Sequence, residues 1–241
     1  MSKINTGPVQ EQLSQPGSSI KKYQQSVVGD GSIVDLMLYE VINFVCMSLP
    51  GGLGRSLRRL GLSMISDHIG RHVQLGTNIF FLQPRKLHIE DNVVIGDNVT
   101  LGIKNSGEGI VLKGNVSIGD GTILNCAGAA ITIGKATKIK DDCRLGSLKG
   151  LTVGESCTIG PYTCISGAGH ASSDLSRPMI KQPLVSKGHT IIENHVEIGE
   201  RVTILDGVFI GSKSKIADDS LVIRDIPSGS HVVGVPAKSC F

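Results

Sequence analysis

Large aliphatic residues recur at every sixth position along most of this chain, from Ile69 to Val222. They come in blocks of three, and seven such blocks follow one another. A period of six matches neither the 3.6-residue period of an α-helix nor the two-residue alternation of a simple strand. The blocks are Ile69, Leu75, Phe81; Ile89, Ile95, Leu101; Leu112, Ile118, Leu124; Ile133, Ile139, Leu145; Val153, Ile159, Ile165; Ile192, Ile198, Ile204; and Ile210, Ile216, Val222.

A six-residue repeat of this kind is typical of a parallel β-helix. Gly often follows the large aliphatic residue, and a smaller residue such as Val93 or Cys143 stands two positions before it. The 241 residues include 31 Gly, no Trp and only 3% aromatic residues. This composition fits a solenoid, because a solenoid stacks medium-sized aliphatic side chains in similar layers and needs a cap at each end. The sequence therefore predicts an all-β fold, a parallel β-helix of about seven coils.

The spacing between blocks predicts where the chain leaves the solenoid. Successive blocks begin 20, 23, 21, 20, 39 and 18 residues apart, whereas three hexapeptides need only eighteen residues. The excess predicts small corner loops at 105–109, 127–130 and 148–150, and one large loop at 167–190. Function is expected at this large loop, because a regular solenoid core carries no chemistry of its own.

Four segments follow from these patterns. Residues 1–18 are rich in Gln, Ser, Gly and Pro and are predicted to form a disordered tail. Residues 19–66 are predicted to be a helical segment and residues 67–226 the β-helix. Residues 227–241 are predicted to be a C-terminal cap, with three valines folding back over the last coil, namely Val232, Val233 and Val235.

The apolar stretch at 33–49 in the helical segment has two interpretations. Seventeen residues that include two acids are short for a membrane span. One interpretation is a helical cap over the open first coil of the solenoid. The other is an amphipathic anchor at 33–62 that makes peripheral contact with an anionic membrane, with Arg58 and Arg59 at headgroup level.

Charge and cysteine content restrict the partners. The formal net charge is only +3, and no Lys/Arg-rich run is present, so nucleic acid is not expected as a partner. The six cysteines form no CxxC pair, so no metal is expected, and Cys143 and Cys157 are interpreted as reduced core residues. Residues 1–22 are polar and do not resemble a secretory signal, so a cytoplasmic location is expected, with possible attachment to the inner face of the membrane left open.

Three further motifs make a resemblance specific. The stretch Ile159-Gly160-Pro161-Tyr162 is followed by Ile165-Ser166-Gly167-Ala168-Gly169-His170, and Pro178 and Gln182 stand in the loop behind it. The chain ends with Ile223-Arg224-Asp225-Ile226-Pro227 and then Gly234-Val235-Pro236-Ala237-Lys238. With the repeats at 69–222, these motifs resemble the hexapeptide-repeat acyltransferases. The resemblance is to the maltose and galactoside acetyltransferases and the sugar O-acetyltransferases of polysaccharide biosynthesis.

The resemblance implies a left-handed parallel β-helix, against the usual right-handed crossover preference. It also implies a homotrimer with active sites between subunits, acetyl-CoA as donor substrate, and the hydroxyl of a sugar or glycan intermediate as acceptor. His170 would be the general base, because an imidazole can take the hydroxyl proton near neutral pH. No covalent enzyme intermediate is implied.

The other candidate site residues have more than one interpretation. By resemblance, Asp142 and Gln182 would bind the acceptor, although Asp142 is equally interpreted as a solvated turn residue. Glycines and basic residues of the last coils would accommodate CoA, although exposed lysines are more often merely solvated. Glu197, Glu200 and Arg201 depart from the family pattern, and Glu200 would repel phosphates. The candidates for CoA binding are Gly199, Arg201, Gly211, Lys213 and Lys238.

Three other functions are compatible with parts of this sequence pattern. An N-acyl or amino-acid O-acyl transferase of the same fold is possible, but about 66 N-terminal residues are too few for the helical domain of a serine acetyltransferase. A zinc enzyme like the gamma-class carbonic anhydrases is disfavoured, because His170 has no second histidine close behind it in the sequence. The next one, His189, is nineteen residues further on. A non-catalytic β-helix scaffold subunit is the third alternative.

Overall fold

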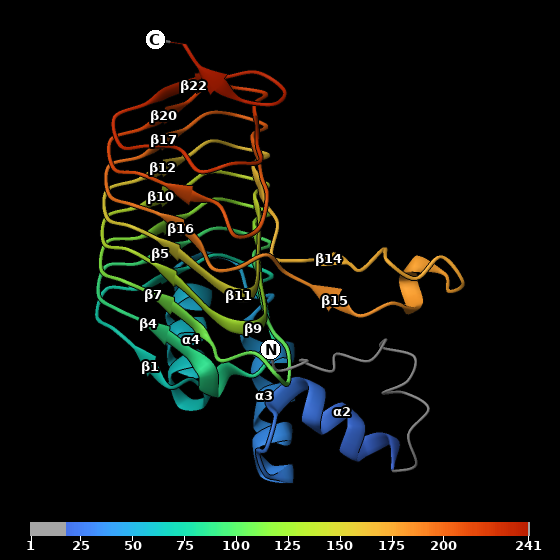
Figure 1. Ribbon diagram of the computed structural model, residues 1–241. Helices are drawn as coiled ribbons and strands as arrows, with labels where there is room; N and C mark the ends of the chain where they lie inside the picture. Colours follow the sequence, from blue (N-terminus) through green and yellow to red (C-terminus); the bar gives the residue numbers. More distant parts are fainter. Residues whose placement is uncertain (1–17, 241) are drawn as a thin grey trace.

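The computed structural model describes residues 18–240, which form a β-helix with three helices at its N-terminal end (Figure 1). The predicted left-handed parallel β-helix of about seven coils, with an N-terminal helical segment, is confirmed. The disordered tail predicted for residues 1–18 lies outside the described residues, except for Ser18.

Each coil places one short strand on each of three faces, and corresponding strands stack in parallel. The first face holds β1 (His68–Ile69), β4 (Leu87–Ile89), β7 (Ile110–Leu112), the last parts of β9 (Ile123–Ile133) and β11 (Arg144–Val153), β16 (Thr190–Ile192) and β19 (Phe209–Ile210). The second face holds β2 (Gln74–Leu75), β5 (Val94–Ile95), β8 (Ser117–Ile118), β10 (Lys138–Ile139), β12 (Thr158–Ile159), β17 (Glu197–Ile198), β20 (Lys215–Ile216) and β22 (His231–Val233). The third face holds β3 (Phe80–Phe81), β6 (Thr100–Ile103), the first parts of β9 and β11, β13 (Cys164–Ile165), β18 (Thr203–Ile204) and β21 (Leu221–Val222).

The repeated aliphatic residues stack directly on one another. Ile69 pairs in register with Ile89, and Ile139 pairs with Ile159. Parallel strands lie about 4.8 Å apart, so side chains of similar size make continuous van der Waals columns inside the prism. The six-residue period therefore encodes both the coil and its register.

The small residues that precede the aliphatic positions fill the inner corners of each coil. Thr122 is fully buried, and its hydroxyl donates to the Lys140 carbonyl of the next coil at 2.9 Å. Cys143 is also buried, and burial raises the pKa of its thiol to about 11, so the thiol stays neutral. The cysteines whose side chains are described are free thiols, namely Cys126, Cys143, Cys157, Cys164 and Cys240.

Each coil has three corners, here numbered by the faces they join. The first corner joins the first and second faces, as at 70–73, and the second corner joins the second and third faces, as at 76–79. The third corner leads back from the third face to the first, as at 82–86. At the first two corners the chain turns through left-handed residues such as Asn98, with φ 57°. Asn and Asp tolerate this conformation better than most residues, which explains their frequency there.

The third corner differs from the sequence prediction in two coils. Segments 127–130 and 148–150 were expected to be loops, but they lie inside the continuous strands β9 and β11. The two segments pair with each other through Cys126–Ser147 and Ala129–Lys149, with a register shift between them. Because neighbouring coils carry extra residues at the same corner, the extra backbone forms hydrogen bonds between coils.

The N-terminal helices are α2 (Ser19–Val28), α3 (Ile33–Cys46) and α4 (Gly51–Ile65). A capping box starts α3: Asp35 N–H donates to the Ser32 hydroxyl, and Ser32 N–H donates to the Asp35 carboxylate. All three helices lie between residues 19 and 66. Helix α3 ends before Pro50, and Gly51 and Gly52 lie in the first turn of α4.

Helix α4 covers the first coil of the solenoid. Arg58 is only 2% exposed, and its guanidinium donates to the Leu75 carbonyl at 3.1 Å and to the Leu49 carbonyl. The expectation that Arg58 lies at membrane headgroup level is therefore wrong, because this side chain is buried between the helix and the solenoid. Arg59 remains exposed.

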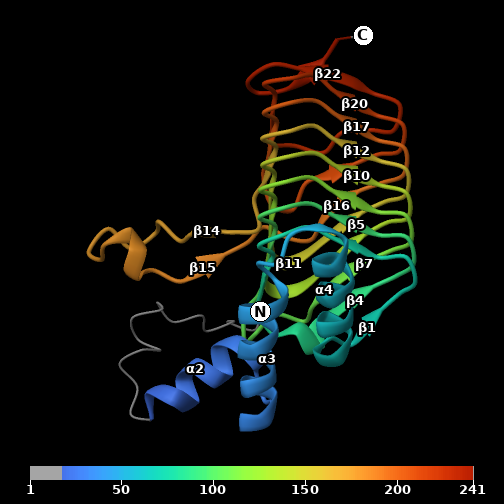
Figure 2. The same cartoon turned by 180° about the vertical axis from the view of Figure 1, so that it is seen from behind.

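At the other end, β22 and the antiparallel strand β23 (Lys238–Ser239) close the solenoid (Figure 2). Val232 is buried, as expected of a cap residue. The expectation was wrong for Val233 and Val235, which are 47% and 71% exposed. They face solvent because residues alternate sides along β22 and the chain then turns at Gly234, where φ is 100°.

Candidate active site

A two-stranded arm projects from the third corner of the solenoid (Figure 1). The arm, residues 167–189, leaves after β13 and returns at β16. It consists of β14 (Gly169–His170), the short 3-10 helix η2 (Met179–Lys181) and β15 (Leu184–Val185), with His170 opposite Leu184 in the antiparallel ladder. The large loop that the spacing predicted is therefore an ordered hairpin with His170 near its root.

The His170 ring is oriented by the backbone of the returning strand. Its Nδ1 lies 3.0 Å from the carbonyl oxygen of Gln182. A carbonyl can only accept, so Nδ1 must carry the proton, and Nε2 of the neutral ring then has a free lone pair. The residue is exposed. This arrangement gives an accessible base in a defined tautomer.

Gln182 has a different place from the one expected for an acceptor-binding residue. The residue is only 8% exposed, and its amide Nε2 donates to the carbonyls of Asp174 at 2.8 Å and Arg177 at 3.2 Å. The side chain is thus occupied inside the arm. It holds the tip of the arm in the conformation that brings the Gln182 carbonyl to His170.

Asp142 is not brought to His170 within one chain. It lies at the second corner, between β10 and β11, with φ 55°, whereas the arm starts at the third corner. Its neighbour Asp141 belongs to a ladder of carboxylates along this corner, in which Asp141 accepts from Asp120 N–H at 2.9 Å. The Asp142 side chain is exposed.

The two glycines expected to make room for CoA are explained by coil stacking. A Cβ on Gly199 would lie 2.2 Å from the Asp218 carboxylate and 2.7 Å from its backbone nitrogen. A Cβ on Gly211 would lie 2.4 Å from the backbone nitrogen of Ser228. In both cases the next coil already occupies the space, so the close approach that requires glycine is internal to the solenoid.

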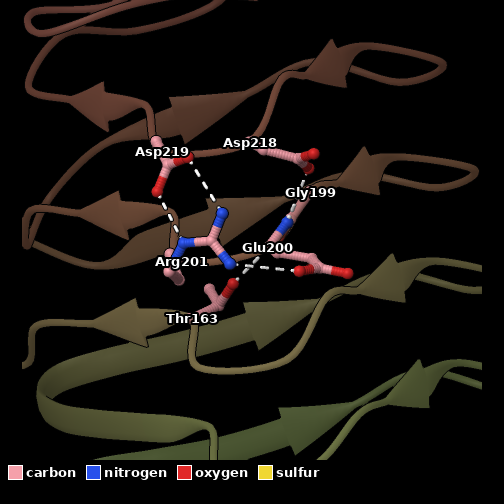
Figure 3. A network of polar contacts seen from close by, with 6 residues as sticks. All are labelled: Thr163, Gly199, Glu200, Arg201, Asp218 and Asp219. Carbon is pink, nitrogen blue, oxygen red and sulfur yellow. Dashed lines mark hydrogen bonds and ion pairs between the residues drawn. The ribbon is translucent and has the colours of Figure 1, made fainter.

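Arg201 is likewise engaged within the chain (Figure 3). Its guanidinium forms a bidentate pair with Asp219, at 2.7 Å and 3.0 Å, and a further contact with Glu200 at 3.2 Å. The hydrogen bond to Asp219 raises the pKa of Arg201, and the same contact lowers the pKa of Asp219. Any phosphate would have to compete with two carboxylates for Arg201.

This pair gives a prediction about pH. The folded-state pKa of Asp219 is depressed, so its contribution to stability is present above the unfolded pKa and is lost as the pH falls through the folded value. Arg201→Gln should therefore melt below the wild type at pH 7, by a small margin because the pair is exposed, and the difference should shrink towards pH 3. Thermal melts of both proteins at the two pH values measure this. An equal difference at both values would contradict the assignment.

The two lysines proposed for CoA lie apart from each other. Lys213 is exposed at the first corner between β19 and β20, with φ 58°. Lys238 is exposed in β23, opposite Val233. The five candidates for CoA binding therefore occupy two different corners of the last two coils and the cap.

Sequence reasoning missed the residues that anchor the arm. The His189 ring nitrogen Nε2 lies 2.8 Å from the Thr152 hydroxyl, and Lys187 N–H donates to the Asp206 carboxylate. The position of His189 at the end of the large loop was the available signal, but its partner Thr152 comes from another coil. These contacts hold the returning strand of the arm against the solenoid.

The described part of the chain contains neither a candidate metal-binding group nor a candidate membrane-spanning helix. Within residues 18–240, no group of three His, Cys, Asp or Glu side chains could hold a metal ion. Over the same residues, none of the helices is long and apolar enough to cross a membrane.

No family model matches the chain, but it is similar to curated acyltransferases. It is 28% identical over 143 residues to WbbJ of Escherichia coli K12, named a lipopolysaccharide biosynthesis O-acetyl transferase, covering 56% of this chain and 72% of WbbJ. It is 42% identical over 72 residues to a tetrahydropyridine-dicarboxylate N-acetyltransferase of Clostridium perfringens, covering 30% of this chain and only 28% of that enzyme.

A solved structure shares the fold. AntD, an N-acyltransferase from Bacillus cereus crystallised with dTDP and 3-hydroxybutyryl-CoA, superposes with a TM-score of 0.51 at 20% identity, covering 72% of this chain and 81% of AntD. The chain is therefore similar in sequence to hexapeptide-repeat acyltransferases and shares the fold of AntD.

Proposed function

We propose that this protein transfers an acetyl group from acetyl-CoA to a hydroxyl of a sugar or glycan intermediate, with His170 as the general base. The observation that carries the proposal is the 3.0 Å contact between His170 Nδ1 and the Gln182 carbonyl at the root of the arm. In the neutral ring this contact leaves the lone pair on Nε2, which can accept a proton. The similarity to WbbJ supports a glycan acceptor.

The reaction follows from this tautomer. His170 Nε2 accepts the proton of the acceptor hydroxyl while its oxygen attacks the thioester carbonyl. A carbon–oxygen bond forms, the carbon–sulfur bond breaks, and the proton passes from the imidazolium to the departing thiolate. Backbone N–H groups of a coil turn would stabilise the negative charge on the carbonyl oxygen. General-base assistance of this kind contributes about two to four orders of magnitude to the rate.

Gln182 acts as a positioning residue in this proposal. Its amide ties Asp174 and Arg177 to the returning strand, so the carbonyl that orients His170 stays in place. Asp142 is retained as an acceptor-binding residue contributed by a neighbouring subunit, because its corner lies away from the arm of its own chain.

The donor would lie along the last coils. Lys213 and Lys238 are exposed cations that can meet the phosphates of CoA. Arg201 is a weaker candidate because Asp219 and Glu200 already pair with it. Gly199 and Gly211 would contribute by allowing consecutive coils to pack closely, since the next coil fills the space beside each of them.

The assembly we propose is a homotrimer with active sites between subunits. The arm carries large apolar side chains that a single chain leaves in solvent: Leu175 is 97% exposed and Ile180 71% exposed. Burying them against a second subunit would stabilise the oligomer. It would also bring a corner of that subunit's solenoid close to His170. An acetyl-CoA donor and free thiols fit a cytoplasmic location.

An amine acceptor is the second candidate. The relative with 42% identity is an N-acetyltransferase, and AntD is an N-acyltransferase. The same His170 tautomer could take a proton from an attacking ammonium or amine, so the site chemistry fits both acceptors.

A thiol-release assay tests the function. Purified full-length protein with acetyl-CoA should release free CoA thiol only when a glycan acceptor is added, and mass spectrometry should show a product heavier by one acetyl group. An ester product is cleaved by hydroxylamine and an amide is not, which separates the two acceptors. Absence of turnover with every acceptor, together with no rise of the melting temperature in CoA, would overturn the proposal.

A further inference from the structure

Helix α3 exposes one continuous apolar face. The exposed side chains recur at helical spacing along its whole length, and Phe44 is 87% exposed. The face consists of Ile33, Val34, Met37, Val41, Phe44 and Val45. The two acids of the helix have partners elsewhere: Asp35 pairs with Arg85 at 2.6 Å, and Glu40 accepts from the Tyr23 hydroxyl at 2.5 Å.

Helix α4, which packs against α3, adds a second exposed apolar stripe. Leu53, Leu60 and Met64 are each at least 60% exposed and lie at positions i, i+7 and i+11. The opposite side of α4 is buried through Leu62 and Ile65. Both helices therefore bury one side in the protein and leave an apolar side in solvent, which costs free energy unless a partner covers it.

A basic groove of about 520 Å³ adjoins the stripe of α4. Arg55 and Arg59 line it from the helix and His72 from the first coil, while Leu60 belongs to both the groove and the apolar stripe. None of the residues lining the groove is Asp or Glu. The lining of this groove is thus positively charged, although Asp97, whose pKa is lowered mainly by hydrogen bonds, lies near enough for Arg55 to lower it further.

We propose that this surface, the exposed side chains of α3 and α4 with the groove at Arg55 and Arg59, docks on an anionic phospholipid bilayer. Apolar side chains would enter the boundary between headgroups and acyl chains, and the arginines would meet lipid phosphates. Helix α3 has 14 residues and spans only about 21 Å, so it lies on the bilayer surface and does not cross it. The groove favours this occupant over a second copy, because a second copy would present the same positive charge.

Vesicle co-sedimentation of the full-length protein tests the proposal without any acyl-transfer substrate, so its outcome is independent of the proposed reaction. Wild type should partition at least tenfold more strongly to vesicles of 30 mol% phosphatidylglycerol in phosphatidylcholine than to phosphatidylcholine alone, and high salt should weaken the binding. Val41→Glu and Phe44→Glu should each reduce binding by about tenfold or more. Arg59→Gln should reduce it by about fivefold.

The matched control is Val233→Glu. Val233 is 47% exposed and Val41 57% exposed, and the two lie at opposite ends of the molecule (Figures 1 and 2). This variant should bind as the wild type does, and circular dichroism should show that all variants are folded. Wild type remaining in the supernatant with both vesicles would overturn the proposal. So would a loss of binding equal in Val233→Glu and Val41→Glu, or a fall in solution mass in Phe44→Glu without any lipid binding, which would assign the face to a second copy.

Discussion

His170→Ala should lose at least 100-fold in kcat/KM for acetyl transfer while keeping the fold. A 100-fold loss corresponds to about 2.7 kcal/mol of transition-state stabilisation. The physical reason is that Ala leaves no group at the root of the arm to take the hydroxyl proton, whereas the solenoid that positions the substrates is untouched. Steady-state thiol release with the best acceptor measures the effect, and added imidazole should restore part of the rate.

Two companion variants separate chemistry from folding. His195→Asn changes another exposed histidine at a left-handed turn, φ 59°, which Asn tolerates, so its rate should stay within a few-fold of wild type. Gln182→Ala removes the amide that holds the arm and should lower kcat more than it changes KM, by about tenfold. Full activity in His170→Ala would remove this residue from the mechanism.

Ile192→Ala should lower the free energy of unfolding by about 2–5 kcal/mol, because a fully buried side chain is truncated in a column that cannot collapse. Ile192 stacks on Val153 below and on Ile210 above, where the arm rejoins the solenoid. For a chain of this length such a loss lowers the melting temperature by roughly 2–4 °C per kcal/mol. Guanidinium denaturation followed by circular dichroism measures the difference.

Ile191→Ala is the control on the same strand. Ile191 pairs with Thr152 and Phe209 on the outer side of the first face and is only partly buried. This substitution should lower the free energy of unfolding by less than 1 kcal/mol in the isolated chain, since it removes little buried apolar surface. Equal losses in the two variants would mean that the stacked columns inside the prism do not dominate stability.

The repeat made much of the fold predictable. A residue such as Ile139 needs only its own six-residue neighbourhood to be placed inward, and the coil then pairs it with Ile159. The break in the repeat likewise placed His170 at the root of a protruding segment. Helix α2 lies in the segment predicted to be helical, and of its residues only Val27 and Val28 are buried.

The candidate site was less predictable, because the partners of these side chains come from the next coil or from the folding of the arm on itself. Arg201 was free to bind phosphate on sequence grounds, but Asp219 stands eighteen residues later and directly above it. The sequence suggested that Gly199 leaves space for a ligand, but Asp218 of the next coil fills that space. Gln182 read as an acceptor contact, but the arm folds back and uses its amide internally.

The repeat was enough to predict the coil, its register and the interruption that carries His170, because a solenoid repeats one local rule and each hexapeptide obeys it independently. Only the tertiary structure decided which side chains remain available for chemistry. Stacking brings residues about eighteen to twenty positions apart to within hydrogen-bond distance, and the hairpin of the arm sets the Gln182 carbonyl against His170. Those contacts occupy some of the candidate side chains and orient His170. The six-residue period of the sequence does not predict them.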